Sequence, residues 1–192
     1  MKTIAKTALY FIAGFTLMLV AIGTSHADEA APVGSRFILN NHNGKIVMDR
    51  DFQGSFMLVA FGYTYCPDIC PTALSNMAAA LDELGDRARQ IVPIFISVDP
   101  ERDTPARLRE YVPHFHPRLV GLSGPAGMID RVTSGYRAIY KKVPSTDGDP
   151  KNYTIDHTAS IYLMAPDGKF LVKFAHAMNP GEMANRIRDF ID

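Results

Sequence analysis

Two apolar runs mark the centre of the predicted fold. Residues 56–61 and residues 91–98 are mostly apolar, which is typical of strands covered on both faces of a sheet. After the first run, apolar residues recur at steps of three and four up to Gly85, a natural helix C-cap. After the second, Thr104 and Pro105 open a helix as a cap residue followed by proline. This alternation of strand and helix predicts an α/β domain with a central sheet.

Shorter elements are predicted on both sides of these two units, and neither an internal repeat nor a second domain is evident. In chain order they are a hairpin at residues 36–47, a connection at 49–54, a short strand at 119–122, a helix at 127–138, an extended segment at 139–143, a loop at 144–152, two hairpin strands at 160–164 and 170–174, and a last helix from Asn179.

The first 27 residues have the pattern of an export signal. Lys2 and Lys6 give a positive start, an apolar run of about 15 residues follows, and the segment ends in small residues suited to cleavage. The run is shorter than the roughly 20 residues that span a bilayer, so cleavage is favoured, and an uncleaved N-terminal anchor stays open. Residues 28–35 are predicted to be a flexible leader, and residues 36–192 to form one domain.

Charge argues against nucleic acid as a partner. The sequence has 20 basic and 20 acidic side chains, and removing residues 1–27 leaves 18 basic against 20 acidic, a net charge of −2 without a basic stripe. We therefore expect no nucleic-acid partner, and contact with a membrane only through the N-terminal segment. The expected location is periplasmic, either soluble or anchored to the inner membrane.

The candidate chemistry lies where the first strand meets its helix. Cys66 and Cys70 are the chain's only cysteines. If the helix already covers Cys66, their spacing puts both thiols on one face, and if it begins later, the turn can still bring them together. Either way the pair could share a metal ion or close a small ring. Amide N–H groups and the positive end of the helix dipole favour thiolate at this place.

A purely structural disulfide is the less favoured interpretation. Closing so small a ring stabilises by roughly 2 kcal/mol, the low end for disulfides. A domain of this length can bury about 70% of its unfolded surface and does not need the bridge. In an oxidising compartment the two cysteines must therefore be paired, metal-bound or kept reduced by a partner.

Other side chains carry weaker signals. His42 falls in the hairpin turn and is predicted to be solvated. Met77 is predicted to be core, although a thioether near a copper site could be a ligand. His114 and His116 could bind a metal, but in a proline-flanked loop they are more typical of ordinary polar residues. His157, just before a predicted strand, is by itself typical of a hydrogen-bonded structural residue.

Three separated motifs, in this order, resemble the Sco/SenC family of copper-binding proteins tied to cytochrome oxidase assembly. They are FGYTYCPDICP at residues 61–71, SVDPERDTP at residues 97–105 and DHT at residues 156–158, and the resemblance covers most of residues 33–192. It implies an α/β, thioredoxin-like fold in which helices flank a central mixed sheet, with an added N-terminal β-hairpin.

The resemblance also implies the site. Cys66, Cys70 and His157 would be the copper ligands. Asp99 would lie beside the site, where it could orient His157 or accept protons, and its alternative role is that of a turn residue before the helix. Two thiolates and one imidazole suit Cu(I), and with an extra oxygen ligand they can hold Cu(II). Zinc is the competing metal.

The function implied is that of a periplasmic copper chaperone, which binds one copper ion and delivers it to the dinuclear copper centre of cytochrome c oxidase. Its partner would be the oxidase subunit that carries this centre. Other periplasmic copper chaperones and thiol reductases are further candidate partners.

The alternative is a thiol-disulfide oxidoreductase. Cys66 and Cys70 would then be the redox-active pair and would reduce the target cysteines before copper loading. Three residues separate the cysteines instead of the usual two, and residues 156–160 contain no proline where thioredoxins place a cis-proline. These features favour a metallochaperone over an enzyme. Peroxidase activity is a weaker third interpretation, supported by the fold alone.

Overall fold

The computed structural model describes residues 33–34, 36–149 and 151–191. The predicted signal at residues 1–27 and most of the predicted leader lie outside the described residues. Within those ranges, none of the helices has the length and apolar character that crossing a membrane requires.

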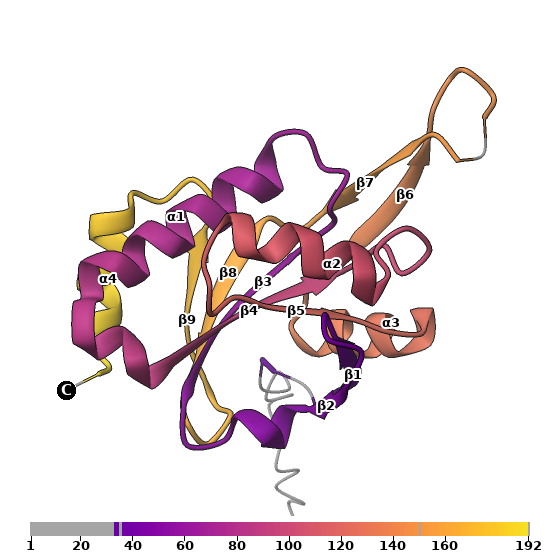
Figure 1. The fold of residues 1–192 in the computed structure, drawn as a ribbon. Coiled ribbons are helices and arrows are strands. Elements are labelled where there is room, and N and C mark those ends of the chain that lie inside the picture. Colours follow the sequence, from indigo (N-terminus) through magenta and orange to yellow (C-terminus); the bar gives the residue numbers. More distant parts are fainter. Residues whose placement is uncertain (1–32, 35, 150, 192) are drawn as a thin grey trace, which may run out of the picture. The chain divides into compact units, whose positions relative to one another are not determined.

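A seven-stranded mixed sheet forms the centre of the domain (Figure 1). Its strands, in spatial order, are β2 (Ile46–Met48), β1 (Ile38–Asn41), β5 (Val120–Ser123), β4 (Ile91–Ser97), β3 (Phe56–Gly62), β8 (Ser160–Met164) and β9 (Phe170–Ala175). The pairs β3–β4 and β4–β5 are parallel, and the others are antiparallel. The predicted α/β class, the central mixed sheet and the N-terminal hairpin are confirmed.

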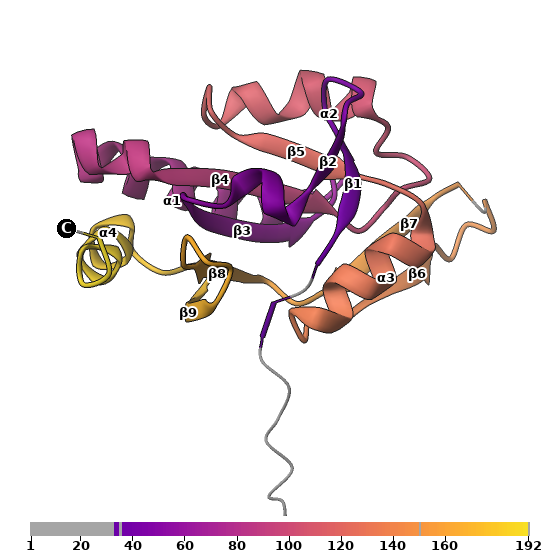
Figure 2. The ribbon, with the colours of Figure 1, turned by 90° about the horizontal axis from the view of Figure 1, so that it is seen from below.

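Both faces of β3 are buried, as its continuous apolar run predicts. Leu58 and Ala60 pack with the buried faces of α1 (Ile69–Leu84), α2 (Pro105–Tyr111) and α4 (Pro180–Arg188). Val59 and Phe61 point the other way, into a second core with α3 (Ala126–Gly135). Figure 2 shows α2 and α3 on opposite sides of the sheet. The period-two alternation of a strand therefore builds two cores on one sheet.

Helix α1 begins at Ile69, two residues before Pro71, so it includes Cys70 and leaves Cys66 in the preceding turn. Its buried face contains Met77, which is confirmed as a core residue. The helix ends at Gly85, whose φ of 57° lies in the left-handed region that glycine adopts most readily.

The predicted starts of α2 and α4 are confirmed by their capping contacts. The side chain of Thr104 accepts a hydrogen bond from the amide of Arg107, and that of Asn179 accepts from the amides of Gly181 and Glu182. Short 3-10 helices fill three connections: η1 (Asp49–Phe52), η2 (Gly85–Gln90) and η3 (Val112–His114).

Strands β6 (Tyr140–Pro144) and β7 (Tyr153–His157) form a separate antiparallel ribbon that projects from the domain (Figure 1). The extended segment at residues 139–143 is confirmed as β6. Residues 153–157 were not predicted as a strand, and the structure corrects this. Tyr153 and Ile155 are buried in the α3-side core, while Thr154 and Asp156 are exposed. That period-two alternation was the missed signal.

Candidate metal centre

The turn between β3 and α1 brings the two cysteines together. The Cys66 amide donates to the carbonyl of Tyr63 at 3.2 Å, which closes the turn. The Cys70 amide, in the first turn of α1, donates to Cys66 Sγ at 3.4 Å. Of the two arrangements that the spacing left open, the one in which the turn joins the sulfurs applies. The free amide at the helix start contacts sulfur, as the sequence predicted.

His157 reaches the same place from the end of β7. Its Nε2 lies 3.1 Å from Cys70 Sγ, and its Nδ1 lies 3.1 Å from the carbonyl oxygen of Thr158. A carbonyl only accepts, so Nδ1 carries the proton and Nε2 presents its lone pair toward the sulfurs. One ligand atom from each of Cys66, Cys70 and His157 lies within 4.8 Å of the others.

The two free thiols are electrostatically coupled. The hydrogen bond with Cys70 lowers the pKa of Cys66, and the amides of Asp68 and Cys70 lower it further. The hydrogen bond with Cys66 and burial both raise the pKa of Cys70. Cys66 is therefore the half-buried thiolate and Cys70 the buried thiol.

Gly62 makes room for the second sulfur. A Cβ at this position would lie 2.7 Å from Cys70 Sγ and 2.8 Å from the Phe95 ring, both too close for real carbon atoms. The glycine at the end of β3 therefore sets how closely the first turn of α1 packs on the sheet.

Tyr63 contacts both halves of the site. Its backbone hydrogen-bonds Cys70, its hydroxyl hydrogen-bonds the backbone of Ile155 in β7, and its buried ring meets the His157 ring edge-on at a centroid distance of 6.0 Å. One side chain thus links the cysteine turn to the strand that carries the histidine.

Asp99 is buried near this region but does not contact His157. Its carboxylate accepts hydrogen bonds from Arg102 Nε and from the Tyr153 hydroxyl, the latter at 2.7 Å. Nδ1 of His157 is held by the carbonyl of Thr158 instead. The hydrogen bonds of the Asp99 side chain are thus made to Arg102 and Tyr153.

The other histidines singled out by the sequence take structural positions. His42 was expected to be solvated, and this is wrong: it is half-buried, its Nδ1 accepts from the Gly121 amide at 3.1 Å, and burial lowers its pKa. His116 Nδ1 accepts from the Arg118 amide, and His114 is exposed. None of the three joins a group of potential metal ligands in the part of the chain that the structure describes.

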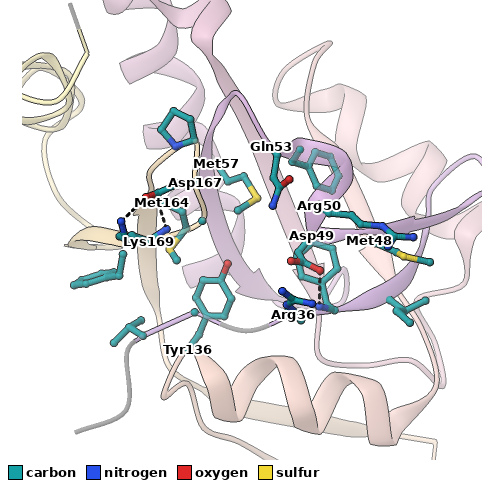
Figure 3. A pocket seen from close by; sticks show the side chains of 18 of the residues that line it. Arg36, Met48, Asp49, Arg50, Gln53, Met57, Tyr136, Met164, Asp167 and Lys169 are labelled. Carbon is teal, nitrogen blue, oxygen red and sulfur yellow. Dashed lines mark hydrogen bonds and ion pairs between the residues drawn. The ribbon is translucent and has the colours of Figure 1, made fainter. Parts of the chain in front are cut away.

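A cavity lies elsewhere in the described domain. It has a volume of about 890 Å³ and is lined by Met57, Met164 and Tyr136 among others (Figure 3). Met57 is near the start of β3, whereas Cys66 follows the end of that strand. The cysteine–histidine group is therefore separate from this cavity.

Sequence reasoning missed two contributors to the site, Gly62 and Arg102. Both stand inside the motifs at residues 61–71 and 97–105, next to residues that were singled out. A glycine in a buried strand signals close approach of another group, which could have identified the first. The role of Arg102 depends on contacts with distant segments, so no local sequence pattern could have indicated it.

The SCO1/SenC family model matches residues 25–192. The chain belongs to the SCO1/SenC family. A SCO2-like protein of Rickettsia conorii is 39% identical over 162 residues, which cover 84% of this chain and 78% of that relative. The structure of Bradyrhizobium japonicum ScoI with copper bound is similar at 46% identity, with a TM-score of 0.75 over 82% of this chain and 99% of that one.

A more distant solved relative connects the family to oxidase assembly. BsSco, 25% identical with a TM-score of 0.65 over 83% of this chain and 94% of that one, is described as a member of the Sco family of cytochrome c oxidase assembly proteins and has a disulfide switch. With these neighbours, the predicted thioredoxin-like fold is confirmed.

Proposed function

We propose that this protein is a periplasmic copper chaperone, which binds one copper ion and delivers it to the dinuclear copper centre of cytochrome c oxidase. The ligands are Cys66 Sγ, Cys70 Sγ and His157 Nε2. The observation that carries the proposal is the convergence of these three atoms within 4.8 Å. The copper bound by Bradyrhizobium ScoI and the description of the Sco family as oxidase assembly proteins support the cargo and the partner.

The geometry needs only a small adjustment to close around a metal. Two ligand atoms each about 2.3 Å from one ion can be at most about 4.6 Å apart. Copper would replace the Cys70 proton that faces His157 Nε2. Because both thiols must be deprotonated and the imidazole neutral, copper affinity falls as the pH falls.

Three exposed apolar side chains adjoin residues of the group and suit it for hand-over. Tyr65 adjoins Cys66 and is 54% exposed, and Ile69 adjoins Cys70 and is 41% exposed. Ile139, 76% exposed, exchanges hydrogen bonds with Thr158, the neighbour of His157. We call Tyr65, Ile69 and Ile139 the apolar rim. It offers the oxidase subunit an apolar surface at the point where copper leaves.

The periplasmic location rests on the export pattern of residues 1–27. Both cysteines would meet an oxidising compartment there, so a thiol reductase or a copper donor must keep the pair available for copper.

A titration of the reduced protein with Cu(I), under anaerobic conditions and against a chelator of known affinity, tests the proposal. We expect one equivalent to bind, and Cys66→Ser, Cys70→Ser and His157→Ala each to lose it. His116→Ala is the control, because that histidine lies outside the group, and it should bind like the wild type. Full retention of copper by the three ligand variants would reject the proposal.

Thiol-disulfide exchange is the second candidate, and the coupled thiols favour it. Thiol-disulfide exchange starts with attack by a thiolate, and Cys66 is a half-buried thiolate beside a protonated partner. The disulfide switch of BsSco supports the same chemistry. Brisk reduction of insulin disulfides that does not depend on His157 would favour the oxidoreductase, and slow or absent turnover would favour the chaperone.

A further inference from the structure

The guanidinium of Arg102 lies between tyrosine rings from two separate segments. Arg102 belongs to the connection between β4 and α2. Its Cζ lies 4.7 Å from the ring centroid of Tyr65, in the cysteine turn, and 3.5 Å from that of Tyr153, at the start of β7. The side chain is only 16% exposed, and its Nη2 is buried without a hydrogen-bond partner. Ring faces therefore supply much of the guanidinium's surroundings.

Polar contacts fix the same arginine to β7. Nη1 donates to the carbonyl of Tyr153 at 3.1 Å, and Nε donates to Asp99, which also accepts from the Tyr153 hydroxyl. Lys142 on β6 covers the Tyr153 ring at 3.7 Å and pairs with Glu101 at 2.8 Å. The first residue of β7 is thus held at its backbone, its hydroxyl and its ring.

The β6–β7 ribbon depends on such contacts for its position. Its two strands pair with each other and not with the seven-stranded sheet, and an isolated two-stranded ribbon is marginally stable. Tyr153 and His157 are the two ends of one short strand, so fixing the first directs the second toward the cysteines.

We propose that Arg102 is a positioning residue, which joins the cysteine turn to the histidine strand through Tyr65 and Tyr153. By holding β7 in place, Arg102 keeps His157 bound to the copper and so slows copper release. The part of this inference that concerns copper release rests on the proposed function, whereas the part that concerns β7 does not.

Hydrogen exchange of the copper-free protein tests the structural part. We use Arg102→Lys, which keeps the charge beside Asp99 but loses the planar stack, and Tyr65→Leu, which removes one ring from an exposed position. Tyr65→Leu should speed amide exchange across residues 153–157 by about 3- to 10-fold, the range expected for losing one cation–π contact. Arg102→Lys should speed it at least as much, because it also loses the Tyr153 stack and the Nη1 hydrogen bond.

Arg107→Lys is the matched control. Arg107 also lies over the Tyr65 ring, at 5.3 Å, and donates to Thr64, so both of these contacts are on the cysteine side. It should leave exchange in residues 153–157 at the wild-type rate. Unchanged exchange in Arg102→Lys and Tyr65→Leu, or equal acceleration in Arg107→Lys, would overturn the proposal.

The rate at which a chelator removes Cu(I) from the loaded protein tests the consequence. Arg102→Lys should speed release at least about 3-fold, whereas Arg107→Lys, whose contacts lie on the cysteine side, should release copper at the wild-type rate. A wild-type release rate in Arg102→Lys, or equal acceleration in Arg107→Lys, would overturn it. If the wild type takes up no copper, the proposed function fails, and the exchange measurement still decides whether Arg102 holds β7.

Discussion

At the scale of single residues, the missing side chain of Gly62 and the unequal protonation of two thiols shape the site. The contact distances of 2.7 and 2.8 Å around a hypothetical Cβ leave no space for even a methyl group at the end of β3. The hydrogen bond between the two thiols lowers the pKa of Cys66 and raises that of Cys70, and burial raises the pKa of Cys70 further.

Gly62→Ala should displace Cys70 Sγ. We expect a loss of about 1–3 kcal/mol in the free energy of unfolding from overpacking, and weaker Cu(I) binding because the two sulfurs no longer meet. Urea denaturation and chelator competition measure the two effects. Gly127→Ala is the control, since nothing lies within 4 Å of its Cβ position; it should leave the Cu(I) affinity unchanged and should not lower the stability, because alanine is the better helix former in α3. A Gly62→Ala protein with wild-type stability and affinity would contradict the packing argument.

In the reduced, copper-free protein, iodoacetamide should modify Cys66 before Cys70. The lowered pKa keeps Cys66 a thiolate at pH values where an ordinary thiol, with a pKa of about 8.5, is protonated. Its alkylation rate should therefore stay nearly constant between about pH 6 and 8. In urea-unfolded protein, the alkylation rates of both cysteines should fall about tenfold for each pH unit below their pKa of about 8.5. Peptide mass spectrometry follows each site, and earlier modification of Cys70 would refute the assignment of the thiolate.

At the scale of elements, the buried carboxylate of Asp103 connects the loops that follow β3 and β4. It accepts hydrogen bonds from the backbone and hydroxyl of Thr64, at 2.9 and 2.6 Å, and from the hydroxyl of Ser97 at 2.5 Å. Thr64 stands two residues before Cys66, so this carboxylate sets where the cysteine turn leaves the sheet.

Asp103→Ala should destabilise the domain by about 2–4 kcal/mol, because three buried donors lose their acceptor. Asp103→Asn should cost less, since one acceptor oxygen remains. Urea denaturation of the copper-free proteins gives both values. Equal stabilities for Asp103→Ala and the wild type would show that the hydrogen bonds of Asp103 contribute nothing.

The difference in stability between the wild type and Asp103→Asn should depend on pH. Burial raises the pKa of Asp103, so the folded protein holds this proton more tightly than the unfolded chain. Its contribution to stability is full below the unfolded pKa of about 3.9 and is lost as the pH rises through the folded pKa. The stability advantage of the wild type over Asp103→Asn should therefore shrink as the pH rises from about 4 toward neutrality. An advantage that grows with pH would contradict the direction of the shift.

At the scale of the whole described domain, the cysteine–histidine group lies beyond the carboxyl ends of the parallel strands β3 and β4, where α/β proteins commonly place their sites. The three residues of the apolar rim adjoin this group in the chain or through Thr158. The large cavity of Figure 3 is lined instead by residues near the start of β3 and the end of β8.

On the proposed function, Ile139→Asp should slow copper transfer to the copper-free soluble domain of the oxidase subunit by about 3- to 10-fold, as expected for losing an apolar contact in an interface. Its Cu(I) affinity should stay at the wild-type value, because Ile139 donates no ligand. The optical spectrum of the dinuclear centre follows the transfer. Ile46→Asp, at a site 68% exposed on β2, is the control and should transfer normally. Equal slowing by both variants would argue against the rim as the docking surface.

The sequence alone determined the elements that are encoded locally. The apolar runs predicted β3 and β4, and the caps at Thr104 and Asn179 placed α2 and α4, because burial pattern and end chemistry are properties of neighbouring residues. The spacing of Cys66 and Cys70 predicted that these two come together, and the resemblance then added His157, although no pattern in the chain could show that the histidine meets them.

Only the tertiary structure decided that meeting. Cys70 and His157 are 87 residues apart, and their contact depends on where the β6–β7 ribbon is held against the domain. The anchoring of His42 on Gly121 and the enclosure of Arg102 by tyrosines depend on the same long-range packing. Local periodicity predicts which face of an element is buried. What that face touches is decided by the order of the strands and by contacts between distant segments.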